Sequence, residues 1–124
     1  MPGNNISHVD LRGLTYLSHL ILPENQLSSI DLSGFVNLAT LDLSKNKLSF
    51  LDVSRLINLS MISLTDNNLS NISFDDLPSL TQLYLQGNKL ISLDFSGVDA
   101  INSLDLSDNY LTALPESLTN LSSL

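Results

Sequence analysis

Few side chains in this sequence could perform acid–base or metal chemistry. Two histidines, His8 and His19, accompany 13 Asp and Glu residues, and cysteine is absent. Without cysteine there is no thiolate ligand, cysteine nucleophile or disulfide, so nothing joins the histidines in a zinc site. His19 could combine with Glu24 or Asp42 in a catalytic group, but 20 serines make accidental Ser–His–Asp combinations unavoidable. The sequence therefore predicts no enzymatic activity, no cofactor and no metal centre.

The charge balance is strongly acidic. The 124 residues include 13 Asp and Glu against 5 Lys and Arg, a formal net charge of −8. A surface that neutralises phosphates needs the opposite sign, which argues against nucleic acid and anionic lipid as partners. No apolar run approaches the roughly 18 uncharged residues of a membrane span, so membrane insertion is not expected. Apolar residues make up 43% of the chain, which is enough to bury a core.

A repeat of 21 residues runs through the chain. Leu, Ser and Asn, with 29, 20 and 13 copies, make up half of the sequence, and such bias is typical of an internal repeat. One Asn recurs every 21 residues, with an aliphatic residue two positions later, at Asn4, Asn25, Asn46, Asn67, Asn88 and Asn109. Upstream of it, five copies of Leu-x-x-Leu-x-Leu-x-x-Asn-x-Leu begin at Leu17, Leu38, Leu59, Leu80 and Ile101.

This spacing predicts the architecture. In Leu-x-Leu the two leucines flank one residue of the opposite face, which is the periodicity of a β-strand. One short strand cannot bury its own apolar face, but stacked copies form a parallel sheet. The short period leaves no room for a long crossover helix, so the return halves should be extended or 3-10 segments. We expect a curved solenoid with the sheet on its concave side and parallel strands near Leu20-Leu22, Leu41-Leu43, Ile62-Leu64, Leu83-Leu85 and Leu104-Leu106.

The pattern resembles the leucine-rich repeat over nearly the whole chain. The return halves read Ser-Ser-Ile-Asp-Leu-Ser-Gly at 28–34 and Ile-Ser-Leu-Asp-Phe-Ser-Gly at 91–97. This form is similar to the 21-residue repeats of bacterial surface and secreted proteins and of the internalins. The last copy departs from it, because Leu-Pro-Glu-Ser-Leu at 114–118 resembles the more widespread LPxxL return. The resemblance implies a right-handed coil of the α/β class and a secreted or cell-surface location, while the residues alone leave a cytoplasmic location open.

Stacked repeats would align two polar columns. We interpret the Asn column as a structural ladder, in which each amide is buried and bonds backbone groups that would otherwise be unpaired. The second column lies in the return halves and comprises Asp10, Asp31, Asp52 and Asp94, with Ser73 and Pro115 at the equivalent positions. These carboxylates would either accept hydrogen bonds from their own turns or share a divalent cation that relieves their repulsion. The absence of a glycine–aspartate calcium loop favours the turns.

Residues between and just after the strand leucines should point away from the core and could bind a ligand. They are His19, Ile21, Glu24, Thr40, Asp42, Lys45, Met61, Ser63, Asp66, Gln82, Tyr84, Gln86, Ser103, Asp105 and Asp108, with Pro23, Ser44, Thr65, Gly87 and Ser107 beside them. Five are acids and one is a base, and apolar groups lie among them. This mixture favours an unidentified protein or peptide partner, preferably basic, with Tyr84 as the anchor. A structural spacer is the alternative, because drift on an idle surface gives the same variation.

The organisation of the chain also carries expectations. Residues 1–124 should form a single leucine-rich repeat domain, with five full repeats and a partial repeat at each end. A solenoid needs caps over its terminal core, but Met1-Pro2-Gly3 offers none and Leu124 ends the chain inside a strand motif. We therefore expect either a fragment of a longer array or end-to-end self-association through the uncapped termini.

Overall fold

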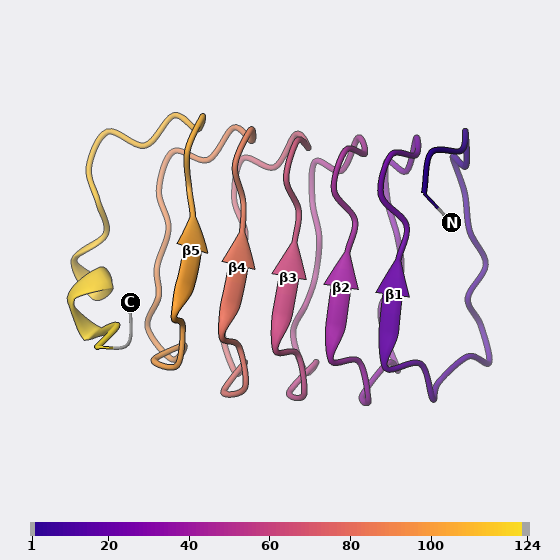
Figure 1. Ribbon diagram of the computed structural model, residues 1–124, viewed down its shortest axis with the longest axis horizontal. Coiled ribbons are helices and arrows are strands. Elements are labelled where there is room, and N and C mark those ends of the chain that lie inside the picture. Colours follow the sequence, from indigo (N-terminus) through magenta and orange to yellow (C-terminus); the bar gives the residue numbers. More distant parts are fainter. Residues whose placement is uncertain (1, 123–124) are drawn as a thin grey trace.

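Five short parallel strands form one layer of the molecule, and the return segments form a second layer behind them (Figure 1). The computed structural model describes residues 2–122. The strands are β1 (His19–Ile21), β2 (Thr40–Asp42), β3 (Met61–Ser63), β4 (Gln82–Tyr84) and β5 (Ser103–Asp105). They lie in sequence order, and each pairs with the next at an offset of one repeat, so that Leu20 lies beside Leu41 and Leu41 beside Ile62. The predicted parallel solenoid is confirmed.

The strands are shorter than the leucine motif, and the return halves are extended or 3-10 segments, as expected. Each strand has three residues and ends before the second leucine of its motif, although Leu22 N still donates to the carbonyl of Asp42 at 2.9 Å. Within residues 2–122 a 3-10 helix occurs in one place, η1 (Glu116–Asn120), which follows Pro115. The other return halves are extended segments and turns, as the Ser-Asp-Gly composition of their sequences favours.

The core lies between the two layers. Alternation along each strand places one side chain inward, and the second leucine of each motif joins it, so that Leu41, Leu43, Ile62 and Leu64 are fully buried. Aliphatic and aromatic residues of the return halves meet them from behind, among them Leu32, Val53, Phe74 and Phe95. Phe74 and Phe95 belong to neighbouring repeats, and their rings stack with centroids 6.4 Å apart and planes 4° apart.

Each repeat turns twice through left-handed backbone. The first turn uses the residue before each ladder asparagine, namely Gly3, Glu24, Lys45, Asp66, Gly87 and Asp108. The second uses a return-half column of Gly13, Gly34, Arg55, Asp76 and Gly97. A side chain in this region costs about 1–2 kcal/mol because its Cβ crowds the following carbonyl. Arg55 and Asp76, the two non-glycine residues of the second column, therefore carry this backbone strain.

The asparagines bridge neighbouring coils at the edge where the chain leaves the sheet. Asn67 is buried; its Oδ1 accepts from Leu48 N at 3.0 Å, and its Nδ2 donates to the carbonyls of Leu43 at 3.0 Å and Leu64 at 3.1 Å. Asn46 and Asn88 make the same set of bonds one repeat earlier and later. Each amide thus satisfies backbone groups of two coils, which would be costly to leave unpaired.

The ladder is less regular at its two ends. Asn4 is exposed, and its Nδ2 donates to the nearby carbonyl of Pro2 at 3.2 Å. The expectation that every member of the column is buried is therefore wrong for Asn4, whereas Asn25, Asn46, Asn67 and Asn88 are buried. Asn109 keeps the bonds to Leu85 O and Leu90 N but is half-buried.

Candidate binding surface

The outward side of the five strands forms one continuous surface, which we call the sheet face. It consists of the side chains between and just after the strand leucines in the five repeats: His19, Ile21, Pro23, Glu24, Thr40, Asp42, Ser44, Lys45, Met61, Ser63, Thr65, Asp66, Gln82, Tyr84, Gln86, Gly87, Ser103, Asp105, Ser107 and Asp108. Because the strands are parallel and in register, corresponding residues of successive repeats are neighbours about 4.8 Å apart. The structure thus brings all the sequence-predicted ligand-binding residues onto one side of the sheet.

Exposure differs along the sheet face. The side chains that project furthest belong to His19, Ile21, Glu24, Lys45, Asp66, Gln82 and Asp108. Those that are half-buried belong to Thr40, Asp42, Met61, Ser63, Tyr84, Gln86, Ser103 and Asp105. The apolar Ile21 is 46% exposed although it sits on a strand. An apolar side chain that is held outward by strand alternation is available for contact with a partner.

Tyr84 is fixed in place by its own hydroxyl. Ser63 of β3 lies directly beside it in register, as expected, and Asp105 of β5 lies on its other side. Its hydroxyl oxygen lies 3.0 Å from Ser103 Oγ, a hydrogen-bond distance, so the ring leans toward β5. This bond was not foreseen from the sequence, because it joins different positions of two repeats. An aromatic ring already ordered by such a bond loses little side-chain entropy when it packs against a partner.

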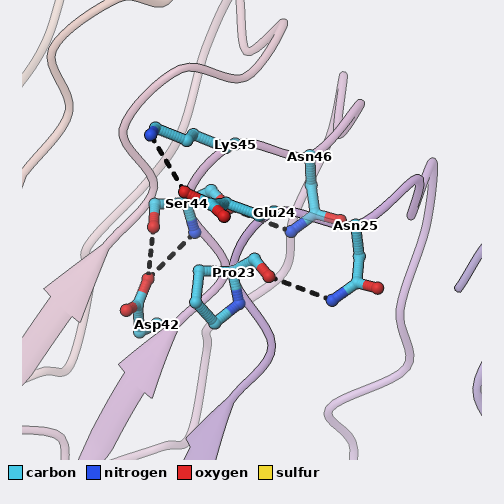
Figure 2. A network of polar contacts seen from close by, with 7 residues as sticks. All are labelled: Pro23, Glu24, Asn25, Asp42, Ser44, Lys45 and Asn46. Atoms are coloured by element: carbon cyan, nitrogen blue, oxygen red, sulfur yellow. Dashed lines mark hydrogen bonds and ion pairs between the residues drawn. The ribbon is translucent and has the colours of Figure 1, made fainter. Parts of the chain in front are cut away.

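Four of the five acids of the sheet face contact neighbouring groups in three ways. Glu24 forms an ion pair with Lys45 at 3.0 Å across neighbouring repeats (Figure 2). Asp42 and Asp105 are each tied to the serine two residues later, and the hydrogen bonds from Ser107 lower the pKa of Asp105. The carboxylate of Asp66 lies over Gly87, where a Cβ would collide with it. The one base of this surface is therefore already paired, and the remaining acids leave a negative field.

The return-side acids serve their own turns. Asp31 Oδ1 accepts from Ser33 N at 2.9 Å, Asp52 makes the same bond to Ser54 N, and Asp94 makes it to Ser96 N at 3.0 Å. Hydrogen bonds from these serines lower the pKa of each carboxyl group because they stabilise its charged form. Within residues 2–122, no group of three His, Asp or Glu side chains is arranged to hold a metal ion.

A groove on the return side of the solenoid was not predicted from the sequence. It lies between the return halves at 28–34 and 49–56, has a volume of about 750 Å³, and is lined by Ile30, Val36, Phe50 and Arg55 among others. Phe50 is 69% exposed. The signal was present in the sequence, because Phe50 stands in a column where neighbouring repeats have the polar residues Ser29, Asn71 and Ser92.

Comparison with known families identifies the repeat. Two leucine-rich repeat family models match the chain, one over residues 37–90 and one over residues 100–121. With the 21-residue register and the parallel coil described above, the chain belongs to the leucine-rich repeat proteins. A search of curated protein sequences found no match.

Within that family the coil resembles the internalins. The functional domain of InlJ from Listeria monocytogenes superposes with a TM-score of 0.92 over 98% of this chain, at 24% identity. The internalin InlF from the same species gives 0.74 over 90% of the chain at 27% identity, and a leucine-rich repeat protein of Leptospira interrogans gives 0.69 over 98% at 27% identity. This chain spans 27%, 34% and 40% of those three structures. InlJ includes a cysteine ladder, whereas this chain has no cysteine.

Of the helices among residues 2–122, none is long and apolar enough to cross a membrane.

Proposed function

We propose that this chain is a non-enzymatic module that binds a protein or peptide on its sheet face. The observation that carries the proposal is the contrast between the two sides of each strand. The inward positions are Leu or Ile in all five repeats, whereas the outward positions vary along the solenoid and combine acids with the apolar Ile21, Met61 and Tyr84. A fixed frame that displays varied side chains is what recognition of a specific partner requires.

The charge of the sheet face supports a basic partner. The sheet face carries five acids and one lysine, and that lysine forms an ion pair with Glu24. A basic partner would approach faster in this field, and its binding would weaken as salt rises. The similarity of the coil to internalins supports a secreted or cell-surface setting for this encounter.

A pull-down tests the proposal. The wild-type protein and the double variant Tyr84→Ala, Asp105→Ala are used as baits in an extract of host cells, with Asp31→Ala as the return-side control. The double variant should lose the partner, since an aromatic hot spot alone contributes about 2 kcal/mol or more to binding. The control should retain it, because Asp31 lies on the opposite layer. If all three baits recover the same proteins in equal amounts, the sheet face is not the binding surface and the spacer function replaces it.

A further inference from the structure

Two carboxylates of the sheet face are held in matching geometry. Asp42 Oδ1 accepts from the backbone N and the Oγ of Ser44, at 3.0 and 2.7 Å. Asp105 Oδ1 accepts from the same two groups of Ser107, at 2.9 and 2.6 Å. The Oδ2 atoms of both residues accept no hydrogen bond from the part of the chain that the structure describes. Each carboxylate therefore presents one unoccupied oxygen, in an orientation fixed by the same pair of bonds.

The register sets the distance between these carboxylates. Asp42, Ser63, Tyr84 and Asp105 occupy the same position on four successive strands. Strands lie about 4.8 Å apart, so the two acids are about 14 Å apart along the sheet. Ser63 has a short side chain, and the ring of Tyr84 leans toward β5 through its bond to Ser103. A side chain of a partner could thus lie over Ser63, beside the ring.

This distance selects one conformation of a partner. In an extended chain, residues i, i+2 and i+4 point to the same side, and i and i+4 lie about 13–14 Å apart. In an α-helix, residues that share a face and are roughly this far apart are i and i+7, at about 10.5 Å, or i and i+11, at about 16.5 Å. Only the extended spacing matches two points about 14 Å apart.

We infer that the partner presents an extended segment that crosses the strands and carries two cationic side chains four residues apart, one on Asp42 and one on Asp105. The side chain midway between them covers Ser63 and contacts Tyr84. This inference rests on the proposed function and adds the chemistry and spacing of the ligand. The charge of the sheet face favours such a ligand, since its single lysine is already paired with Glu24.

Synthetic peptides provide the test. A blocked peptide that contains the core Arg-Thr-Val-Thr-Arg between uncharged flanking residues has the required spacing. Isomers with the same overall composition place the two arginines two or six positions apart. The matched peptide should bind about three- to fivefold more tightly than either isomer in an NMR titration, because each isomer can satisfy only one carboxylate. Asp42→Asn should remove this preference while keeping the turn, since an amide oxygen can still accept from Ser44 N. Asp31→Asn is the matched control and should change nothing.

Two outcomes would overturn the spacing rule. Equal affinity of the three peptides, with all binding abolished by Tyr84→Ala, would leave the sheet face as the binding surface and remove the extended ligand. A preference for helical peptides with arginines seven or eleven positions apart would replace the extended ligand by a helix. Failure of every peptide to bind also refutes the inference, and the pull-down then decides separately whether the sheet face binds a partner.

Discussion

At the scale of single residues, each buried ladder asparagine hydrogen-bonds backbone groups of its own coil and of the preceding one. Asn67 accepts from Leu48 N and donates to Leu43 O and Leu64 O in the buried region between two coils. Truncation to Ala leaves the buried N–H of Leu48 without an acceptor. Leu43 O and Leu64 O each lose one of two amide donors and keep the Nδ2 of Asn46 and of Asn88, respectively. Because water cannot easily replace a buried partner, such losses cost about 1–3 kcal/mol for each group.

Asn67→Ala should therefore lower the free energy of unfolding by about 1–3 kcal/mol, as measured by urea denaturation. Asn4→Ala is the matched control, since the side chain of Asn4 is exposed and water can replace the partners that it loses. Its free energy of unfolding should change by less than about 0.5 kcal/mol. Equal losses in the two variants would show that the amide is not stabilised by its ladder position.

The left-handed turn residues of the return halves offer a reciprocal experiment. Arg55 has φ 66°, at a position where the preceding repeat has Gly34 with φ 89°. Arg55→Gly relieves the crowding of the Cβ and should raise the free energy of unfolding by about 0.5–1 kcal/mol, after allowance for the greater freedom of glycine in the unfolded chain. Gly34→Arg should lower it by about 1 kcal/mol or more; no atom lies within 4 Å of the Cβ that it would add, so strain alone is responsible. Changes of the same sign in both variants would contradict this account.

At the scale of elements, the coils are coupled through aligned side chains. Phe74 and Phe95 occupy equivalent positions of successive return halves and stack at 6.4 Å. Both are almost fully buried. Each repeat contacts only its neighbours in such a solenoid, so direct contacts of this kind carry cooperativity from one coil to the next.

A double-mutant cycle measures that coupling. Phe74→Leu and Phe95→Leu should each cost about 1–2 kcal/mol of unfolding free energy, mainly from lost packing. The double variant should cost less than the sum by about 0.5–1.5 kcal/mol, since the ring–ring contact is lost only once. The pair Leu27 and Phe95 serves as the additive control, because these residues lie three repeats apart and not in neighbouring repeats. Strict additivity for Phe74 and Phe95 would mean that the stacked geometry contributes nothing beyond burial.

The sequence predicted the elements well for a physical reason. Each strand leucine is buried because it recurs at one fixed place in the coil, so a spacing of 21 residues is enough to place Leu41 beside Leu20 and Ile62. The contacts between surface side chains depend on which rotamers those side chains adopt, and the spacing of residues in the repeat does not determine rotamers. The Glu24–Lys45 pair and the hydrogen bond between Tyr84 and Ser103 therefore appeared only with the coordinates. The exposed Asn4 was missed because periodicity treats every member of a column alike.

At the scale of the whole molecule, stability should vary along the solenoid. Leu41, Leu43, Ile62, Leu64, Leu83 and Leu85 are fully buried between coils on both sides. In the fifth repeat, Leu104 and Leu106 are only half-buried, and β5 pairs with a strand on one side in the described sheet. A chain in which each repeat is supported by its neighbours opens first where that support is least.

Native-state hydrogen exchange should reveal this gradient. The amides of Leu43, Leu64 and Leu85 donate to the carbonyls of Ser63, Tyr84 and Asp105, respectively. Of these three amides, those of Leu43 and Leu64 should exchange more slowly than that of Leu85. The amides of Leu118 and Leu121 in and after η1 bond only within their own segment among the described contacts, so they should exchange fastest. Protection that is uniform from β2 to η1 would indicate a single cooperative unit and contradict repeat-by-repeat opening. Protection of the η1 amides that increases with protein concentration would instead show end-to-end association, because only contact between molecules depends on concentration.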